Sequence, residues 1–169
     1  MKITLRALEP ADIDAIYRWE NDPAVWNHSA AHQPFSRHAL QQFIDESSLA
    51  DIYAARQLRL MADADGQPAG CIDLFDFDPH HRRAAIGIIV DHARRRRGIG
   101  KAMLDGLEDF AKEHLLLHQL HCIIAQSNTA CLRLFTGSGY RQCGTLHEWL
   151  RQDGQWHDAL FFQKRLSEQ

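Results

Sequence analysis

The middle of this chain changes its hydrophobic period at a pair of glycines. Residues 85–90 (Ala-Ile-Gly-Ile-Ile-Val) form a continuous apolar run, which is typical of a buried strand. From Gly98 onward the apolar residues recur at helical spacing instead, at Ile99, Met103, Leu107, Phe110 and Ala111. The sequence therefore predicts a buried strand that turns, within a few residues, into an amphipathic helix.

The turn between this strand and this helix has the chemistry of an anion site. Gly98 and Gly100 leave no side chain over the first amide groups of the helix. Those N–H groups lack helical acceptors and lie at the positive end of the helix dipole. Four consecutive arginines, Arg94–Arg97, precede the glycines and add positive charge. We therefore predict that a phosphate group binds here.

Three classes of cofactor bind to glycine-rich turns of this kind, and residue spacing separates them. A Walker loop needs Ser or Thr after Gly-Lys, whereas Gly100-Lys101 is followed by Ala102. A dinucleotide loop needs a third glycine where this chain has Met103. The remaining pattern is Arg-x-x-Gly-x-Gly, in which the loop holds a pyrophosphate. The residues predicted to contact it are Arg95, Arg96, Arg97, Gly98, Ile99, Gly100 and Lys101.

Composition excludes several other classes of protein. The chain has 169 residues, a hydrophobic fraction of 45% and a net charge of −3, as expected for one globular domain over residues 1–169. A nucleic-acid-binding protein would carry a broad basic excess, but here the positive charge is concentrated in Arg82–Arg83 and Arg94–Arg97. No apolar run approaches the roughly 20 residues of a membrane span, and no signal peptide precedes the first strand. We therefore expect neither a nucleic-acid nor a membrane partner, and we expect the protein in the cytoplasm.

Cysteine and histidine do not form a convincing metal site. The four cysteines are widely spaced without a C-x-x-C pair, so reduced and mostly buried thiols are expected. His114, His118 and His121 follow one another closely, but no Cys or carboxylate completes a tetrahedral set with them. We expect no metal ion, and we expect the histidines to lie on the surface.

Periodicity divides the chain into alternating elements without repeats or linkers. Strands are expected at residues 2–8, 57–62, 69–77, 85–90, 120–125, 144–151 and 156–165. Helices are expected after Pro10, after a cap at Ser36, from Gly98 onward, and at residues 129–136 after a cap at Asn128. Asp65-Gly66 and Asp153-Gly154 are typical hairpin turns. This order predicts an α/β (α+β) fold, in which a mixed sheet carries helices on both faces.

Motifs at several places along the chain carry a resemblance to a known family. Beyond the loop of Arg95, Gly98 and Gly100, Asn128 opens the helix after the next strand, and Gly139-Tyr140 closes it. In these respects the chain resembles the GNAT superfamily of acetyl-CoA-dependent N-acetyltransferases. Its segments Trp19-Glu20-Asn21-Asp22-Pro23 and Leu146-His147-Glu148-Trp149 are similar to the subgroup of spermidine and ribosomal-protein N-terminal acetyltransferases. The resemblance covers nearly the whole chain.

This resemblance implies a fold and a cofactor. It implies a twisted, mostly antiparallel sheet of about seven strands. The sheet splays at its centre, where the pantetheine arm of CoA lies beside the strand before Arg94. Acetyl-CoA is the implied co-substrate, and backbone groups of Ile88, Ile89 and Val90 are expected to orient its acetyl carbonyl. Asn128 and Phe135 are further positions expected at the cofactor, and a homodimer through the last hairpin is implied.

Two positions depart from the family pattern. Phe135 replaces the Tyr that usually protonates the departing thiolate, and Ala85 replaces a Glu that often serves as the general base. Loss of a general acid typically costs ~10²–10⁴ in rate, but a thiol of pKa ~8.5 still leaves near neutral pH. The carboxylate candidates for a base are Glu20, Asp73, Asp76, Asp78 and Glu148, of which we select Glu20, Asp76 and Glu148 as catalytic. A base that acts through ordered water stays open.

Together these patterns predict direct transfer of acetyl from acetyl-CoA to a primary amine in a ternary complex, since no Cys occupies a reactive position. A small cationic amine such as a polyamine is the expected acceptor, because many of the candidate site residues are acidic. Two alternatives stay open. One is acetylation of a protein N-terminus, such as that of a ribosomal protein. The other is a CoA-binding module without catalysis, which Phe135 and Ala85 suggest.

Overall fold

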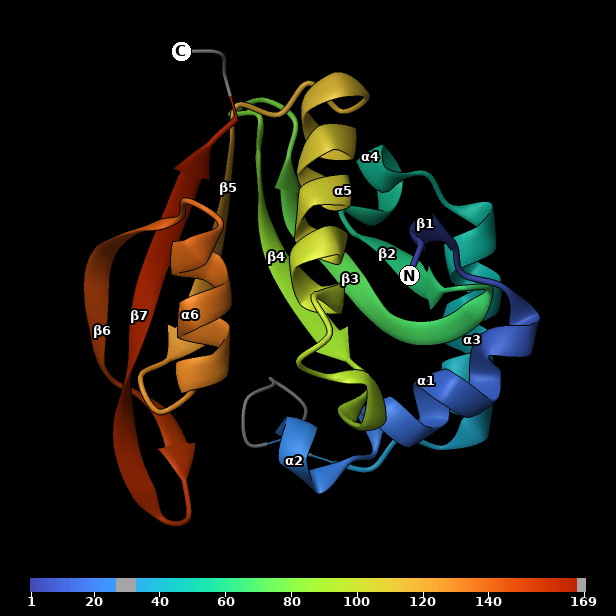
Figure 1. The fold of residues 1–169 in the computed structure, drawn as a ribbon, viewed down its shortest axis with the longest axis horizontal. Coiled ribbons are helices and arrows are strands. Elements are labelled where there is room, and N and C mark those ends of the chain that lie inside the picture. The colour runs from blue at the N-terminus through green and yellow to red at the C-terminus, as the bar shows by residue number, and fades with distance from the viewer. Residues whose placement is uncertain (27–32, 167–169) are drawn as a thin grey trace.

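Seven strands form one sheet, in the order β1-β2-β3-β4-β5-β7-β6, in the computed structural model, which describes residues 1–26 and 33–166 (Figure 1). The strands are β1 (Ile3–Ala7), β2 (Leu58–Ala64), β3 (Gln67–Asp78), β4 (Arg83–Val90), β5 (Gln119–Ala125), β6 (Arg141–Gln152) and β7 (Gln155–Arg165). All neighbouring strands are antiparallel except β4 and β5, which are parallel. The predicted mixed and mostly antiparallel sheet is confirmed.

Helices cover both faces of this sheet. They are η1 (Pro10–Asp12), α1 (Ile13–Glu20), α2 (Pro23–Trp26), α3 (Arg37–Leu49), α4 (Ile52–Ala55), η2 (His92–Arg94), α5 (Ile99–Glu113) and α6 (Thr129–Gly137). In the part of the chain that is described, none of them combines the length and apolar character needed to cross a bilayer.

Alternate residues of the central strands point into two separate cores. On β3, Ile72 packs in one core with Met103 of α5, whereas its neighbour Cys71 packs in the other core with Ile16 of α1 and Ile44 of α3. All five side chains are at most 1% exposed. Full burial of one such aliphatic side chain contributes about 1.5–3 kcal/mol, so the two cores fix which face each strand residue occupies. The predicted placement of helices on both faces is confirmed.

Strands β4 and β5 separate after three paired positions. The parallel register joins Arg83 to Gln119, Ala84 to Leu120 and Ala85 to His121, although β4 continues to Val90 and β5 to Ala125. Along the remainder, β4 keeps only its antiparallel partner β3. Figure 1 shows β4 with α5 diverging from β5 with α6 toward the loop that precedes α5. This opening is the splay that the family resemblance implied.

Local signals in the sequence define the ends of several elements. Ser36 caps α3 by accepting a hydrogen bond from the amide of Ala39 at 3.0 Å, and Asn128 caps α6 by accepting one from the amide of Cys131 at 3.2 Å. Both predicted hairpin turns adopt positive φ, with values of 51° and 80° at Asp65-Gly66 and 50° and 78° at Asp153-Gly154. These caps and turns confirm the predictions.

Other local features were not predicted. The helices α2, α4 and η2 have four, four and three residues, which is too short to produce a helical period in the sequence. β6 begins at Arg141 rather than at the predicted residue 144, because a register shift between Gln142 and Gly144 interrupts its alternation.

Candidate active site

The start of α5 presents a row of amide groups without acceptors. Gly98 is the N-cap, with φ of 78° and ψ of 0°, and its carbonyl accepts the first helical hydrogen bond, from Ala102 at 3.1 Å. The amides of Ile99, Gly100 and Lys101 therefore precede the helical ladder, and no acceptor within the described residues binds them. A Cβ at position 98 would meet nothing within 4 Å, so the left-handed backbone is what requires glycine there.

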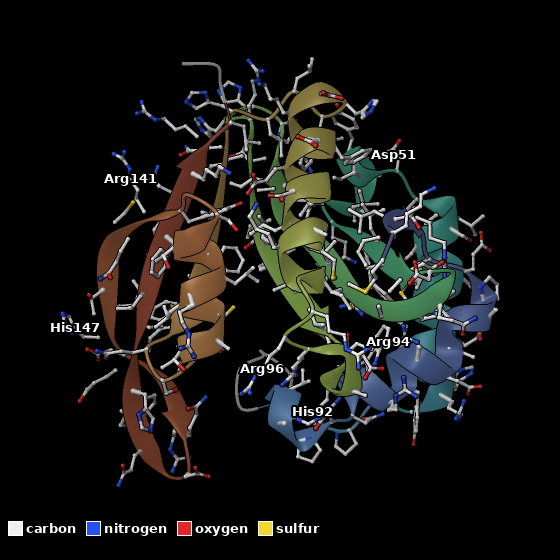
Figure 2. All side chains as sticks on the ribbon, viewed as in Figure 1. Asp51, His92, Arg94, Arg96, Arg141 and His147 are labelled. Atoms are coloured by element: carbon white, nitrogen blue, oxygen red, sulfur yellow. The ribbon has the colours of Figure 1, made fainter. Side chains whose placement is uncertain are left out.

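The arginines before α5 do not all point the same way. The Nε of Arg95 donates to the carbonyl of Val90 at 3.2 Å, and both Arg95 and Arg96 line a long open groove along the splay. Figure 2 shows Arg96 on the side of the loop that faces α6. Arg97 is exposed and does not line the groove, and Lys101 lines it while paired with Asp105.

Asp91 holds the loop in shape at the end of β4. Its carboxylate accepts hydrogen bonds from Arg18 at 2.8 Å, from the indole of Trp19 at 3.0 Å and from the amide of Ala93 at 2.9 Å. Burial alone would raise the pKa of this carboxyl, but these hydrogen bonds and the charge of Arg18 outweigh burial and lower it. The loop is therefore tied to α1 by a carboxylate that stays ionised.

The free edge of β4 exposes backbone groups in the splay. The amide of Asp91 donates to the carbonyl of Ala69 at 2.9 Å, and Cys71 is the register partner of Ile89. Because bonding direction alternates along an antiparallel ladder, the backbone of Ile89 faces β3, whereas that of Ile88 and of Val90 faces the opening. Ile88 therefore presents polar backbone groups to the groove, and Val90 presents its N–H, since its carbonyl accepts from Arg95.

The opposite wall of the groove comes from α6. Asn128 lines it at the helix N-terminus, and Cys131 lines it one turn later. Burial raises the pKa of the Cys131 thiol to about 11, so this cysteine is not a nucleophilic thiolate near neutral pH. Gly100 lets the two walls approach, because a Cβ there would lie 3.3 Å from Leu134 of α6.

Phe135 and Tyr140 pack against each other behind this wall. Phe135 is 1% exposed and meets the ring of Tyr140 edge to face, with a centroid distance of 4.9 Å. Burial, together with the neighbouring Glu108 carboxylate, raises the pKa of the Tyr140 phenol well above its ordinary value. Tyr140 is 3% exposed and does not line the groove, so this ring is a packing residue.

A partly buried ionic cluster lies on the other side of the groove. Arg59 of β2 donates to both carboxylate oxygens of Asp73 on β3, at 2.7 and 2.8 Å, and to Glu20 of α1 at 2.5 Å. The guanidinium also lies 5.2 Å from the ring centroid of Phe43 on α3. Glu20, Phe43, Arg59 and Asp73 all line the groove, and two carboxylates face one guanidinium there. We call these four residues the Arg59 cluster.

The structure does not bring the three selected carboxylates together. Glu20 lines the groove, whereas Asp76 lines a smaller hollow with Asp78, Arg83 and His121. Glu148 is exposed on an irregular stretch of β6, where its amide donates to Asp158 at 2.8 Å. A catalytic role for Glu20, Asp76 or Glu148 stays a prediction.

No metal site is found among the described residues, because no group of three or more His, Cys, Asp or Glu side chains could hold an ion. All four cysteines are free, with Cys71 and Cys122 buried, Cys131 partly buried and Cys143 exposed. The expectation that the histidines lie on the surface is wrong for His157 on β7 and for His121 on β5, which are both partly buried, and His28 and His32 lie outside the described residues. The ring of His121 stacks on Phe161.

Comparison with known proteins identifies the family. A family model described as the acetyltransferase (GNAT) domain matches residues 2–141. The chain belongs to the GNAT acetyltransferase family. It is therefore an acetyl-CoA-dependent N-acetyltransferase that acts on an amine, and the family predicted from its motifs is confirmed.

The relatives of this chain include two bacterial spermidine N(1)-acetyltransferases. Spermidine N(1)-acetyltransferase of Escherichia coli is 24% identical over 160 residues, which cover 94% of this chain and 83% of the relative. The enzyme of the same name from Vibrio cholerae is 22% identical over 158 residues, covering 94% of this chain and 90% of the relative.

Solved structures with the same fold include two of the V. cholerae enzyme. The spermidine N-acetyltransferase in complex with CoA and spermine aligns with a TM-score of 0.87 and 22% identity, covering 97% of this chain and 95% of the other. A dodecameric structure of that enzyme aligns with a TM-score of 0.81 and 22% identity, covering 97% and 94%.

Two residues of the site, Arg59 and His121, were not predicted from the sequence. Arg59 was not recognised as the centre of an ionic cluster, although an arginine between two leucines of a predicted strand is a signal worth following. His121 was grouped with the surface histidines, and only its place on β5 separates it from them.

Proposed function

We propose that this acetyltransferase acetylates a primary amine of a small polycationic amine, such as a polyamine, by direct attack in a ternary complex. The observation that carries the proposal is the division of charge along the groove. Basic side chains line it around the start of α5, and acidic side chains line it at α1, α3 and β3. The basic residues around the start of α5 are His92, Arg95, Arg96 and Lys101, and the acidic residues at α1, α3 and β3 are Glu20, Asp45, Glu46 and Asp73. Arg59 lies among these acidic residues, and Glu9, Arg133, Arg151 and Asp153 line other parts of the groove.

The basic end of the groove fits the cofactor. The pyrophosphate of acetyl-CoA would accept hydrogen bonds from the amides of residues 99–101, supported by Arg95 and Arg96, with Arg97 adding charge from outside. The pantetheine arm would lie along β4, where the backbone groups of Ile88 and Val90 face the opening. Asn128 would contact this arm from the α6 side, whereas Phe135, which is 1% exposed, would support that wall from behind.

The acidic end of the groove fits the acceptor. The Arg59 cluster holds two carboxylates against one guanidinium, and Asp45 and Glu46 of α3 line the groove at the same end. Phe43 and Phe75 also line this end and offer aromatic faces to an ammonium group or an alkyl chain. The names of the relatives, and the spermine bound to the V. cholerae structure, support a polyamine as the acceptor.

Departure of the thiolate would proceed without a tyrosine. Phe135 has no proton to donate, and the raised pKa of Cys131 speaks against a covalent acetyl-cysteine intermediate. A thiol of pKa ~8.5 is a tolerable leaving group near neutral pH, so the thiolate would take its proton from solvent.

The proposal is tested by following thiol release from acetyl-CoA with matched acceptors. We expect spermidine to react with a higher kcat/KM than butylamine, because only the polyamine carries a second cationic group for the acidic end of the groove. Glu20→Gln should raise KM for spermidine and leave KM for butylamine and the Kd of CoA unchanged. Equal kcat/KM for the two amines would contradict a polyamine acceptor.

The two alternatives predict different results in the same assay. An N-terminal acetyltransferase would release thiol faster with a peptide that has a free N-terminus than with any polyamine. A CoA-binding module would bind CoA in calorimetry and release no thiol with any acceptor. The polyamine proposal is favoured over both because the acidic lining lies within the same groove as the anion site.

The extent of the domain, its cellular location and its oligomeric state are also proposals. We expect residues 1–169 to act as one acetyltransferase domain in the cytoplasm, where its four free cysteines would stay reduced. A homodimer through the β6–β7 hairpin is supported by Trp149 and Trp156, which are 56% and 58% exposed on that hairpin. Light scattering of the purified protein would contradict it by finding only the monomer mass.

A further inference from the structure

His121 occupies the point where the sheet opens. It is the register partner of Ala85 in the last of the three paired positions between β4 and β5. Its neighbours Leu120 and Cys122 point into the core that contains α5. Because side chains alternate along a strand, His121 and Ile123 point to the opposite face, which also carries Asp73 and Phe75. His121 therefore lies on the acceptor side of the splay.

The hollow around His121 adjoins the groove. On β3, Phe75 lines the groove and the next residue, Asp76, lines the hollow. On β5, Ile123 lines the groove and His121 lines the hollow, so an acceptor that reaches the end of the splay meets both. The rest of the hollow is lined by Asp78, Arg83, Gln119, Phe161 and Gln163.

The surroundings of His121 favour its neutral form. Its ring stacks on Phe161 with a centroid distance of 5.5 Å and an interplanar angle of 23°. Burial, followed by the charge of Arg83, lowers the pKa of the imidazole, and Asp76 opposes this with a smaller effect. Asp78 is the other charged group of the hollow and faces Arg83 at 3.5 Å. Among the described residues, no hydrogen bond occupies either ring nitrogen of His121.

Asp76 lines the same hollow as His121 and is the alternative carboxylate there, whereas the other candidate bases near the splay are engaged or absent. Ala85, beside His121, carries no titratable group. Glu20 and Asp73 bind the Arg59 guanidinium. Glu148 is exposed on β6 and does not line the groove. His121 is thus a titratable side chain at the end of the splay that can accept a proton from an ammonium group.

We propose that His121 is the general base that deprotonates the acceptor amine, an inference that rests on the proposed function. The ammonium group gives one proton to the imidazole, and the neutral nitrogen attacks the thioester carbon. A C–N bond forms, the C–S bond breaks, and the thiolate leaves. The nitrogen loses a second proton as the amide forms. One of the two released protons ends on the CoA thiol and the other in solvent.

The pH dependence of kcat/KM for spermidine tests this role. In the wild-type protein, kcat/KM should rise at acidic pH and level off by neutral pH, because the base titrates below the ordinary histidine pKa of ~6.5. In His121→Gln, kcat/KM at pH 7 should fall by about 10²–10⁴. Its profile should then keep rising about tenfold per pH unit toward the amine pKa of ~10.4, because only the neutral amine reacts.

A matched variant controls for loss of a histidine whose ring lies beside a phenylalanine ring. His114→Gln removes an exposed ring that lies 5.3 Å from Phe110 at the far end of α5, and it should leave the profile unchanged. The Kd of CoA, measured by calorimetry, should be the same in all three proteins. If His121→Gln does not fold, His121→Ala with added imidazole takes its place, and imidazole should restore the neutral plateau.

Two results separate failure of this inference from failure of the proposed function. An active wild-type protein with a His121→Gln variant that keeps the neutral plateau, within threefold in kcat/KM, would overturn the role of His121 alone. A wild-type protein that binds CoA but releases no thiol with any amine would overturn both.

Discussion

Replacement of Arg59 by methionine tests whether the acidic end of the groove depends on a buried charge. The side chains of Arg59, Glu20 and Asp73 are only 15%, 12% and 23% exposed. Burial alone would lower the pKa of Arg59, but the carboxylates around it raise that pKa well above its usual value. The guanidinium is therefore charged throughout the pH range of any unfolding assay.

The expected loss is large because Arg59→Met leaves both carboxylates without their cation. Removing one partner of a buried ion pair costs about 3–5 kcal/mol, since the remaining charge loses its compensation but stays desolvated. The free energy of unfolding of such a domain is about 5–15 kcal/mol. Arg59→Met should therefore remove at least about a fifth of the stability.

Urea unfolding at pH 7 measures this loss through the midpoint and the m value. The triple variant Arg59→Met/Glu20→Gln/Asp73→Asn should recover most of the loss, because no unpaired charge then stays buried. Arg37→Met is the surface control, since Arg37 pairs with Asp14 at side-chain exposures of 57% and 80% and also stacks on Tyr17. The reasoning is refuted if Arg59→Met shifts the free energy of unfolding no more than Arg37→Met does.

Three smaller perturbations test the cofactor loop and its neighbours. Asp91→Asn should lower stability at pH 7 by about 1–3 kcal/mol. Because the folded pKa of Asp91 is lowered, its contribution is present above the unfolded pKa of ~3.9 and is lost as pH falls through the folded pKa. Urea midpoints should therefore differ between variant and wild type at pH 7 and approach each other as pH falls below the unfolded pKa; a constant difference would contradict this. Asn128→Ala removes the cap of α6 and should cost ~1 kcal/mol, measured by the same unfolding; an unchanged midpoint would show the cap to be dispensable. Gly98→Ala places a side chain at φ of 78° without a steric contact. It should cost roughly 1–2 kcal/mol and weaken CoA binding in calorimetry, and unaltered Kd and stability would argue against a strained loop.

The elements around the cofactor loop could be predicted because each rests on local chemistry. The apolar run at residues 85–90, the glycine at position 98 and the cap at Asn128 act within one turn of the chain. Each therefore produces a recognisable pattern in neighbouring residues. The separation of β4 from β5 produces no such pattern, because an apolar strand has the same sequence whether it lies beside another strand or beside an open groove.

The Arg59 cluster shows why the partner of a side chain is harder to predict than the strand or helix that carries the side chain. The hairpin turn at Asp65-Gly66 pairs Ala64 with Gln67 and Asp63 with Pro68, and this register, if continued, would set Arg59 opposite Ile72. A bulge between Ala62 and Asp63 shifts the register by one residue and sets Arg59 opposite Asp73 instead. One inserted residue thus changes an apolar neighbour into a carboxylate.

The surroundings of His121 depend on the pairing of two strands that are farther apart in the sequence than β2 and β3. β4 and β5 are parallel and are joined through α5, so no turn between them fixes which residues pair. The alternation of residues 119–125 places His121 on the face away from the α5 core, but it does not say that Ala85 lies beside it. That pairing is set by how α5 packs on the sheet, through residues such as Met103 and Leu107. The position of the proposed base is thus decided by the packing of a helix that carries none of the groups that react.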